Sequence, residues 1–340
     1  MLINFIPSPD QDTSNTWRNF VALITVVIGV GLSVGPNIGL AEPVVEVSNR
    51  VLPKIFPSYE QKIIVGGDIT IQPPHVVIPH KPIPRLIGNL PQPSEFTAKS
   101  LFVKDMESNK VLYAKDEYTT RPIASITKLM SALVLLEQPI QWASSTEVVV
   151  GELVDNHMYA GEIYSAEDLW NAGLVASSNK AIMSLVAVSG WDVPQFVARM
   201  NEKALELGMT HTQFVEPTGL DQGNVSTASD VALLLTEALR HEKISTALME
   251  KDYTIRFDGK DHHMWNTNWL LLNWIPQNDF EVVGGKTGYI IASGYNFTVQ
   301  GKNSHGKNIL VVVLGADTHE ARFAEARDVG VEVSDAYIWE

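Results

Sequence analysis

The chain has 340 residues, 45% of them hydrophobic, and can therefore bury one large core or two modest ones. Its formal net charge of −14 argues against nucleic acid as a partner, because phosphate backbones require a basic surface. Nine histidines occur without a His-Glu-x-x-His arrangement and cysteine is absent, which excludes thiolate metal sites and disulfides, so we expect no metal or other cofactor.

Residues 20–41 form an apolar run of about the length that a bilayer requires. Arg18 precedes the run and acidic residues follow it, which predicts a membrane anchor with residues 1–19 in the cytoplasm. A cleavable signal peptide is the alternative, since Gly39 and Ala41 are small residues of the kind found at cleavage sites. A buried helix of a soluble domain is a third interpretation. The first two both place the rest of the chain outside the cytoplasm, either anchored to the cell membrane or secreted.

Residues 42–95 contain ten of the eighteen prolines. Proline removes backbone donors and stiffens the chain, so we expect an extended extracytoplasmic tether with one short strand near 62–71. The alternative is that these residues form an irregular edge of the folded domain.

Residues 96–340 have the pattern of a mixed α and β domain. The segments 99–105 and 110–116 are short strand patterns around a turn, which predicts a hairpin. Helical periodicity follows in four segments, 124–137, 165–190, 192–209 and 226–241. Strand patterns return at 286–291, 294–302 and 307–316, and a closing helix is expected from about Thr318. Strands at both ends with helices between them predict an α+β fold, a sheet flanked by helices with a mainly helical lobe.

The helix 124–137 raises a question about Lys128. This helix is apolar nearly all the way round and should be buried, yet Lys128 lies one turn after Ser125 on the same face. Burial would lower the pKa of a lysine from about 10.4 towards neutrality and make it a base able to activate a serine hydroxyl. Alternatively, the ammonium group extends to the surface. The Ser-x-x-Lys spacing alone does not decide, because it recurs from Ser177 and from Ser304.

Two further motifs distinguish among these serines. Ser177 to Asn179 form a Ser-x-Asn element, and Lys286 to Gly288 form a Lys-Thr-Gly element on an expected strand. A serine-lysine pair, a Ser-x-Asn and a Lys-Thr-Gly, in this order, are typical of serine enzymes that react with penicillin. Only the pair that begins at Ser125 lies upstream of both elements.

From about Lys99 onward the sequence resembles the low-molecular-mass penicillin-binding proteins, which are serine D-alanyl-D-alanine carboxypeptidases and endopeptidases of bacterial cell walls. The resemblance rests on "RPIASITKLMSALVLLE", "SSN", "LGMTHTQFVEPTGLDQGNVSTASD", "NTN", "GGKTGYIIASGYNFT" and "VVLGA". It implies an antiparallel sheet flanked by helices, with a mainly helical lobe. The wording of "ASITKLM" and "FVEPTGL" is similar to the endopeptidase branch, which cuts D-alanyl cross-links.

The resemblance implies catalytic roles for four residues. Ser125 would be the nucleophile that forms an acyl-enzyme, and Lys128 would be its general base. Ser177 would relay a proton to the leaving amine, and Asn179 would orient Lys128 and the substrate amide. The chain departs from the family pattern at Lys180, where many relatives have an acidic residue.

The same resemblance implies a substrate-binding strand. Lys286 would make the site electropositive and help to keep the catalytic lysine neutral, and Thr287 would donate a hydrogen bond to the terminal carboxylate of the substrate. Gly288 would allow close approach of the backbone. The N–H groups of Ser125 and Tyr289 would form the oxyanion hole.

Three functions remain open. The first is a wall peptidase acting on peptidoglycan stem peptides, a carboxypeptidase with endopeptidase as the alternative, that β-lactam antibiotics would inhibit covalently. The second is a β-lactamase-like hydrolase, and the third is a non-catalytic wall-binding module.

Several other residues allow two interpretations each. We expect Glu216 to have a structural role, with deacylation of an acyl-enzyme as the alternative. We expect the tryptophans of 265–274 to pack in a core, with binding of glycan as the alternative. His262 and His263 are expected in a solvated loop. For Arg322 we expect surface pairing, with contact to a substrate carboxylate as the alternative.

Overall fold

The structure is a computed structural model that describes residues 82–149, 155, 157–257 and 260–340. The predicted cytoplasmic segment 1–19, the apolar run 20–41, most of the proline-rich segment and its expected strand near 62–71 lie outside the described residues.

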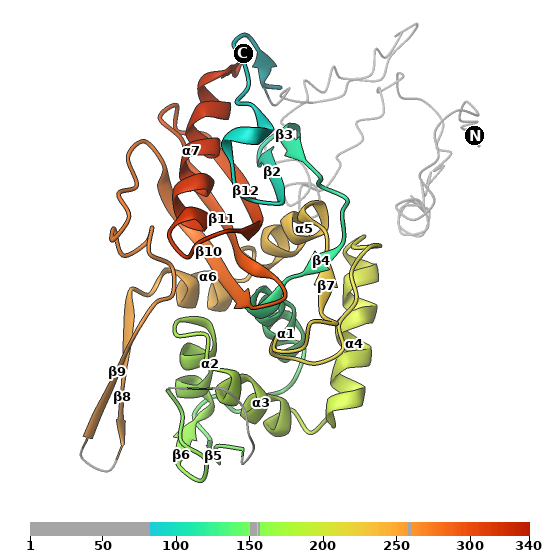
Figure 1. The fold of residues 1–340 in the computed structure, drawn as a ribbon. Helices are drawn as coiled ribbons and strands as arrows, with labels where there is room; N and C mark the ends of the chain where they lie inside the picture. Colours follow the sequence, from blue (N-terminus) through green and yellow to red (C-terminus); the bar gives the residue numbers. More distant parts are fainter. Residues whose placement is uncertain (1–81, 150–154, 156, 258–259) are drawn as a thin grey trace, which may run out of the picture. The chain divides into compact units, whose positions relative to one another are not determined.

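The centre of the fold is a five-stranded antiparallel sheet that joins the two ends of the described chain (Figure 1). Its strands, in spatial order, are β10 (Glu281–Ile290), β11 (Gly294–Lys302), β12 (Asn308–Ala316), β2 (Ser100–Asp105) and β3 (Val111–Lys115). The last of the three C-terminal strands pairs with the first strand of the predicted hairpin, with Val312 opposite Phe102. The predicted hairpin and the three C-terminal strands are therefore confirmed, as is the α+β fold with an antiparallel sheet.

Both faces of the sheet are covered. Helix α7 (Ala321–Asp335) packs on one face, where Phe323 and Val329 join a core with Phe297 and Val311. Helices α1 (Thr127–Leu136) and α5 (Ala228–Ala238) pack on the other face (Figure 1). Burial on both faces explains why β12 is apolar without alternation.

The predicted helical lobe lies beside the sheet and shares the core of α1 and α5. Its further helices are α2 (Ala166–Leu174), α3 (Asn179–Val188), α4 (Val193–Glu206) and α6 (Glu242–Met249). Two of the helices in this region have N-terminal caps, because the Ser165 and Thr227 side chains accept hydrogen bonds from the backbone N–H of Asp168 and Asp230.

The segment 165–190 does not form the single helix that its periodicity predicts. It is divided into α2 and α3. Ser177 lies between them with φ of 62°, and Ser178 caps the second helix by accepting a hydrogen bond from the N–H of Ala181. Because serine and asparagine side chains compete for backbone partners, the Ser-x-Asn motif ends one helix and begins the next.

A second difference concerns the histidines expected in a loop. Residues Asp252–Phe257 and Lys260–Trp265 form a two-stranded hairpin, β8 and β9, and His262 and His263 lie in its second strand. Only His263 is exposed, and it pairs with Asp252 across the hairpin at 3.2 Å. The strand is polar and carries little apolar alternation, so the periodicity gave no signal for it.

The folded domain also begins earlier than the predicted boundary at Phe96. Strand β1 (Arg85–Leu86) pairs with β13 (Tyr337–Ile338), and the Lys110 ammonium donates to the Pro84 carbonyl at 2.7 Å. The end of the proline-rich segment therefore forms an irregular edge of the domain. A strand of two residues is too short to produce a periodic pattern.

No single helix of the described chain is long and apolar enough to cross a membrane. Helices α3 and α4 pass the length and composition test only as a pair, which is bent by 99°.

Candidate active site

The pair Ser125 and Lys128 lies at the start of α1, in the interior of the protein. The 3₁₀ turn η4 (Ala124–Ile126) leads directly into α1, and Ala124 has a φ of 49°. Lys128 is completely buried, and its Nζ lies 2.9 Å from Ser125 Oγ. The long side chain does not reach the surface. The burial of Lys128 that the apolar helix predicts is therefore confirmed.

The Lys128 amine is held by two further contacts. It donates to Asn179 Oδ1 at 2.7 Å and to the Thr218 carbonyl at 2.7 Å. Burial lowers the pKa of Lys128 to about 7, although the charges of Glu216 and Asp155 partly offset this effect. Near neutral pH a substantial fraction of Lys128 is therefore a neutral amine within reach of a serine hydroxyl.

The Ser-x-Asn turn brings a second hydroxyl and a second lysine to the same place. Lys286 donates to Ser177 Oγ at 2.8 Å and is almost completely buried. Burial lowers the pKa of Lys286 well below its usual value, and the neighbouring Lys128 and Arg322 lower it further. Two buried amines thus each face the hydroxyl of a partly buried serine.

Asp155 holds the Ser-x-Asn turn in place. Its carboxylate accepts hydrogen bonds from Ser178 Oγ at 2.5 Å and from the Lys180 N–H at 2.8 Å. The Lys180 ammonium donates to the Met158 carbonyl at 3.2 Å, so the departure from the family pattern binds the loop around Asp155.

The Lys-Thr-Gly strand passes directly against the serine. A Cβ added at Gly288 would lie 2.5 Å from the Ile123 carbonyl and 3.1 Å from the Ser125 N–H nitrogen. Only glycine allows β10 to lie this close to η4. Thr287 Oγ1 donates to Thr267 Oγ1 at 2.6 Å, and Tyr289 follows at the exposed end of the strand.

Glu216 has a structural position. Its carboxylate accepts from the Thr218 N–H at 2.7 Å, from Asn224 Nδ2 at 2.7 Å and from the N–H of Gly219. These bonds fix the loop whose Thr218 carbonyl contacts Lys128. Among the described residues, the hydrogen bonds of this carboxylate are all to its own loop, as the structural interpretation expects.

Arg322 is where the expectation from sequence was wrong. Arg322 is only 4% exposed. Among the described residues, its side chain has no carboxylate partner, and its Nε has no hydrogen-bond partner. The guanidinium donates to the Gly288 carbonyl at 3.3 Å and lies over the rings of Tyr295 and Phe323. Burial lowers its pKa to about 10, partly offset by Tyr295 and Glu320, so it remains a cation at neutral pH. A signal was available, because Arg322 falls on the buried face of α7.

One cavity connects these groups. It has a volume of about 610 Å³ and is lined by Ser125, Ser177, Trp265, Asn266, Thr267, Trp269, Trp274, Thr287, Gly288, Tyr289, Tyr295, His319 and Arg322. The expected core packing holds for Trp269, which is partly buried, whereas Trp265 and Trp274 are half exposed at the mouth.

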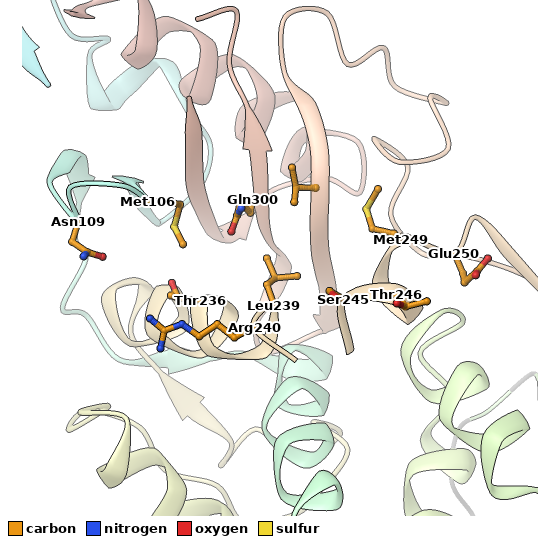
Figure 2. A pocket seen from close by; sticks show the side chains of 11 residues that line it. Met106, Asn109, Thr236, Leu239, Arg240, Ser245, Thr246, Met249, Glu250 and Gln300 are labelled. Carbon is orange, nitrogen blue, oxygen red and sulfur yellow. The ribbon is translucent and has the colours of Figure 1, made fainter. Parts of the chain in front are cut away.

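A second cavity, of about 770 Å³, lies between α5, α6 and the sheet (Figure 2). Arg240 and Glu250 are the charged residues of its lining, and none of the three motifs contributes to it. Across the part of the chain that the structure describes, no cluster of three or more His, Cys, Asp or Glu residues could hold a metal ion. The chemistry therefore centres on the smaller cavity.

Comparison with known proteins agrees with this geometry. The family model of D-alanyl-D-alanine carboxypeptidases, peptidase S11, matches residues 88–318, and the chain belongs to this family. The chain is 31% identical over 246 residues to a D-alanyl-D-alanine endopeptidase of Pseudomonas aeruginosa, covering 70% of this chain and 78% of the relative. It is 30% identical over 241 residues to the D-alanyl-D-alanine carboxypeptidase DacF of Bacillus subtilis, covering 67% and 60%.

Solved structures show the same fold. Penicillin-binding protein D2 of Listeria monocytogenes, in its cefotaxime-bound form, superposes with a TM-score of 0.61 at 30% identity. The match covers 72% of this chain and 99% of that one. The predicted family and the penicillin-binding protein fold are therefore confirmed.

Proposed function

We propose that this protein is a serine D-alanyl-D-alanine peptidase that acts on peptidoglycan stem peptides through an acyl-enzyme on Ser125. The observation that carries the proposal is the completely buried Lys128 amine, 2.9 Å from Ser125 Oγ. Membership of the D-alanyl-D-alanine carboxypeptidase family supports the substrate class.

In the acylation step, neutral Lys128 takes the proton of Ser125 while Oγ bonds to the carbonyl carbon of the penultimate D-alanine. The N–H groups of Ser125 and Tyr289 stabilise the oxyanion. The C–N bond then breaks, and the leaving amine receives its proton through Ser177, which Lys286 contacts at 2.8 Å. Asn179 keeps Lys128 oriented throughout. Water then hydrolyses the ester and restores the serine.

The terminal carboxylate of the substrate is assigned to Thr287 and Arg322. Both line the catalytic cavity, and Arg322 is a buried cation that no carboxylate of the described chain neutralises. Lys286 adds positive potential beside them. A planar guanidinium is well suited to bind a carboxylate.

The same geometry argues for long-lived β-lactam adducts. Structures of penicillin-binding protein D2 hold cefotaxime and ampicillin, which supports β-lactams as covalent inhibitors of this chain too. Glu216 would have to activate water in a β-lactamase-like hydrolase, but its oxygens are engaged by the N–H groups of its own loop. We therefore expect slow release of the penicilloyl group.

The location outside the cytoplasm remains part of the proposal. The apolar run 20–41 supports a membrane anchor or a signal peptide. Mass spectrometry of the N-terminus of the mature protein separates the two, because only an anchor leaves residues 1–41 attached.

The decisive experiment is to incubate the protein with a fluorescent penicillin and to map the adduct by mass spectrometry. We expect the label on Ser125, and no label on the Ser125→Ala variant. The variant should also lose release of D-alanine from pentapeptide by about 10⁴-fold or more. A label on any other residue, or equal hydrolysis by the variant, would contradict the proposal.

A further inference from the structure

A row of aromatic rings lines the catalytic cavity, starting near Arg322. The ring of His319 lies 4.1 Å from Trp269, Trp269 lies 5.5 Å from Trp274, and Trp274 lies 5.8 Å from Trp265, measured between centroids. We call these four side chains the aromatic track. His319 lies three residues before Arg322, just ahead of α7, and is close enough for the Arg322 charge to lower its pKa, so the track begins near the guanidinium.

The outer part of the track is open to solvent. Trp265 is 50% exposed and Trp274 is 52% exposed, and both line the same cavity as Ser125. Adjacent exposed indole rings at the mouth of a cavity are typical of a ligand-binding groove. At the inner end, His319 Nδ1 is buried without a hydrogen-bond partner in the described part of the chain, as is Arg322 Nε. Unpaired buried polar atoms of this kind are available to a bound molecule.

The track lies on the leaving-group side of the site. This step rests on the proposed function, in which Arg322 and Thr287 bind a carboxylate that belongs to the leaving residue. Whatever extends beyond that carboxylate, away from Ser125, meets His319 and then the tryptophans. The acyl part of the substrate stays attached to the serine.

The part of the cavity that the track lines offers apolar surface that a small leaving group would not cover. The whole cavity, which also holds the acyl part of the substrate at Ser125, measures about 610 Å³, within the range of cavities that hold drug-sized ligands. A departing D-alanine has one methyl group as its side chain and would leave the indole faces uncovered. The leaving strand of a cross-link is much larger, because its amine ends a diamino-acid side chain that is part of a second stem peptide.

We propose that the aromatic track is the subsite that binds the leaving stem peptide when a D-alanyl cross-link is cleaved, and that these rings favour cross-links over pentapeptide as substrates. The methylene groups of the diamino acid pack on the faces of Trp269 and Trp274, and the following peptide reaches Trp265. Each cleavage breaks one C–N amide bond, consumes one water and yields a carboxylate on the D-alanine and an amine on the leaving stem.

The test compares two purified substrates, a cross-linked muropeptide dimer and a monomeric muropeptide pentapeptide. For the Trp274→Ala variant we expect the ratio of kcat/KM on the dimer to kcat/KM on the pentapeptide to fall about tenfold, since one aromatic contact is lost. Trp265→Ala should lower the ratio less. Tyr118→Ala is the matched control, because Tyr118 is 65% exposed and does not line the cavity, and it should leave the ratio unchanged.

The other outcomes separate this inference from the proposed function. If the wild-type enzyme trims the pentapeptide but leaves the dimer intact, the inference is wrong and the proposed function stands. An equal loss on both substrates in Trp274→Ala would also overturn it. The dimer is assayed again after an amidase has removed its sugars, and a defect that disappears with them would assign the track to glycan instead. If neither substrate is cleaved and penicillin forms no adduct, both proposals fail.

Discussion

The two cavities described above differ in chemistry more than in size. The larger one, at about 770 Å³, has two charged residues in its lining, Arg240 and Glu250, and Arg240 pairs at its edge with Glu237 at 2.9 Å. The smaller one, at about 610 Å³, contains Ser125 and Ser177, each in contact with a buried lysine. Volume therefore does not identify the site. A buried amine beside a hydroxyl does.

A comparison of two lysines makes the same point. Lys104, on β2, is 7% exposed, and burial together with the nearby charge of Arg240 lowers its pKa. Within the described residues its side chain makes no hydrogen bond or ion pair. Lys128 is more deeply buried, with no exposed surface, and has three hydrogen-bond partners, one of which is Ser125. Burial makes both amines easier to deprotonate. Of the two, only Lys128 lies beside a hydroxyl from which a neutral amine could take a proton.

The largest effect is expected from exchanging these lysines for methionine. Lys128→Met removes the general base and should lower the rate of Ser125 acylation by a β-lactam by about 10³-fold. Lys104→Met removes a buried cation without a partner and should change that rate less than twofold, with equal or higher thermal stability. Stopped-flow acylation and thermal denaturation measure the two quantities. If both variants lost a comparable amount of activity, the loss in Lys128→Met would come from removing a buried lysine and not from removing the base beside the Ser125 hydroxyl.

Much of this contrast could be predicted from the sequence. The three motifs meet in one site, as their order in the sequence predicts. Their residues there are Ser125, Lys128, Ser177, Asn179 and Lys286. The apolar pattern around Lys128 also predicted its burial, because a helix without a polar face has no exposed side on which to place an ammonium group.

Other parts could not be predicted, for physical reasons. The break at Ser177 depends on the Ser178 cap and on Asp155, a residue far away in sequence that binds the turn. The position of Arg322 depends on the packing of α7 against the sheet, where Tyr295 and Phe323 cover the guanidinium. The half exposure of Trp274 likewise depends on tertiary packing, where its ring contacts Trp265 and Trp269. None of these is a local property of the chain.

Two glycines on β10 allow the backbone around the two cavities to be compared. In Gly288→Ala the new Cβ would lie 2.5 Å from the Ile123 carbonyl, and backbone must move to accommodate it. A displacement of about 1 Å at the reacting groups should lower kcat/KM by about 10²-fold. In Gly284→Ala the nearest atom is the end of the Leu239 side chain at 2.6 Å, which lines the larger cavity and can rotate into it.

We therefore expect Gly284→Ala to keep kcat/KM within twofold, at a small cost in thermal stability. Steady-state hydrolysis of a pentapeptide and differential scanning calorimetry provide the two measurements. If Gly288→Ala were as active as the wild type, the close approach of β10 to η4 would have no role in catalysis.

A smaller effect is expected when the arginine of the catalytic cavity, Arg322, is replaced, and none when the arginine of the larger cavity, Arg240, is replaced. Arg322→Ala removes the cation assigned to the substrate carboxylate and should lower kcat/KM for a pentapeptide by about 30-fold, mainly through KM. On the corresponding carboxamide the same variant should lose little, because the charge that Arg322 binds is already missing. Arg240→Ala, at the larger cavity, should leave both substrates unaffected. Equal losses of Arg322→Ala on the carboxylate and the carboxamide would indicate that the guanidinium only supports the Gly288 strand.

The smallest effect is the pH dependence, and its sign follows from the form of Lys128 that reacts. The protonated lysine cannot accept the serine proton, and burial lowers its pKa from 10.5 to about 7. The reactive neutral form therefore predominates above pH 7 and is lost as the pH falls through this value. Acylation of Ser125 should be about tenfold slower at pH 6 than at pH 8. Lys104→Met should follow the same profile, because that amine has no hydroxyl to activate. A rate that is constant between pH 6 and pH 8 would show that Lys128 is already neutral at pH 6 or is not the base, and the contrast between the two buried lysines would then lose its chemical meaning.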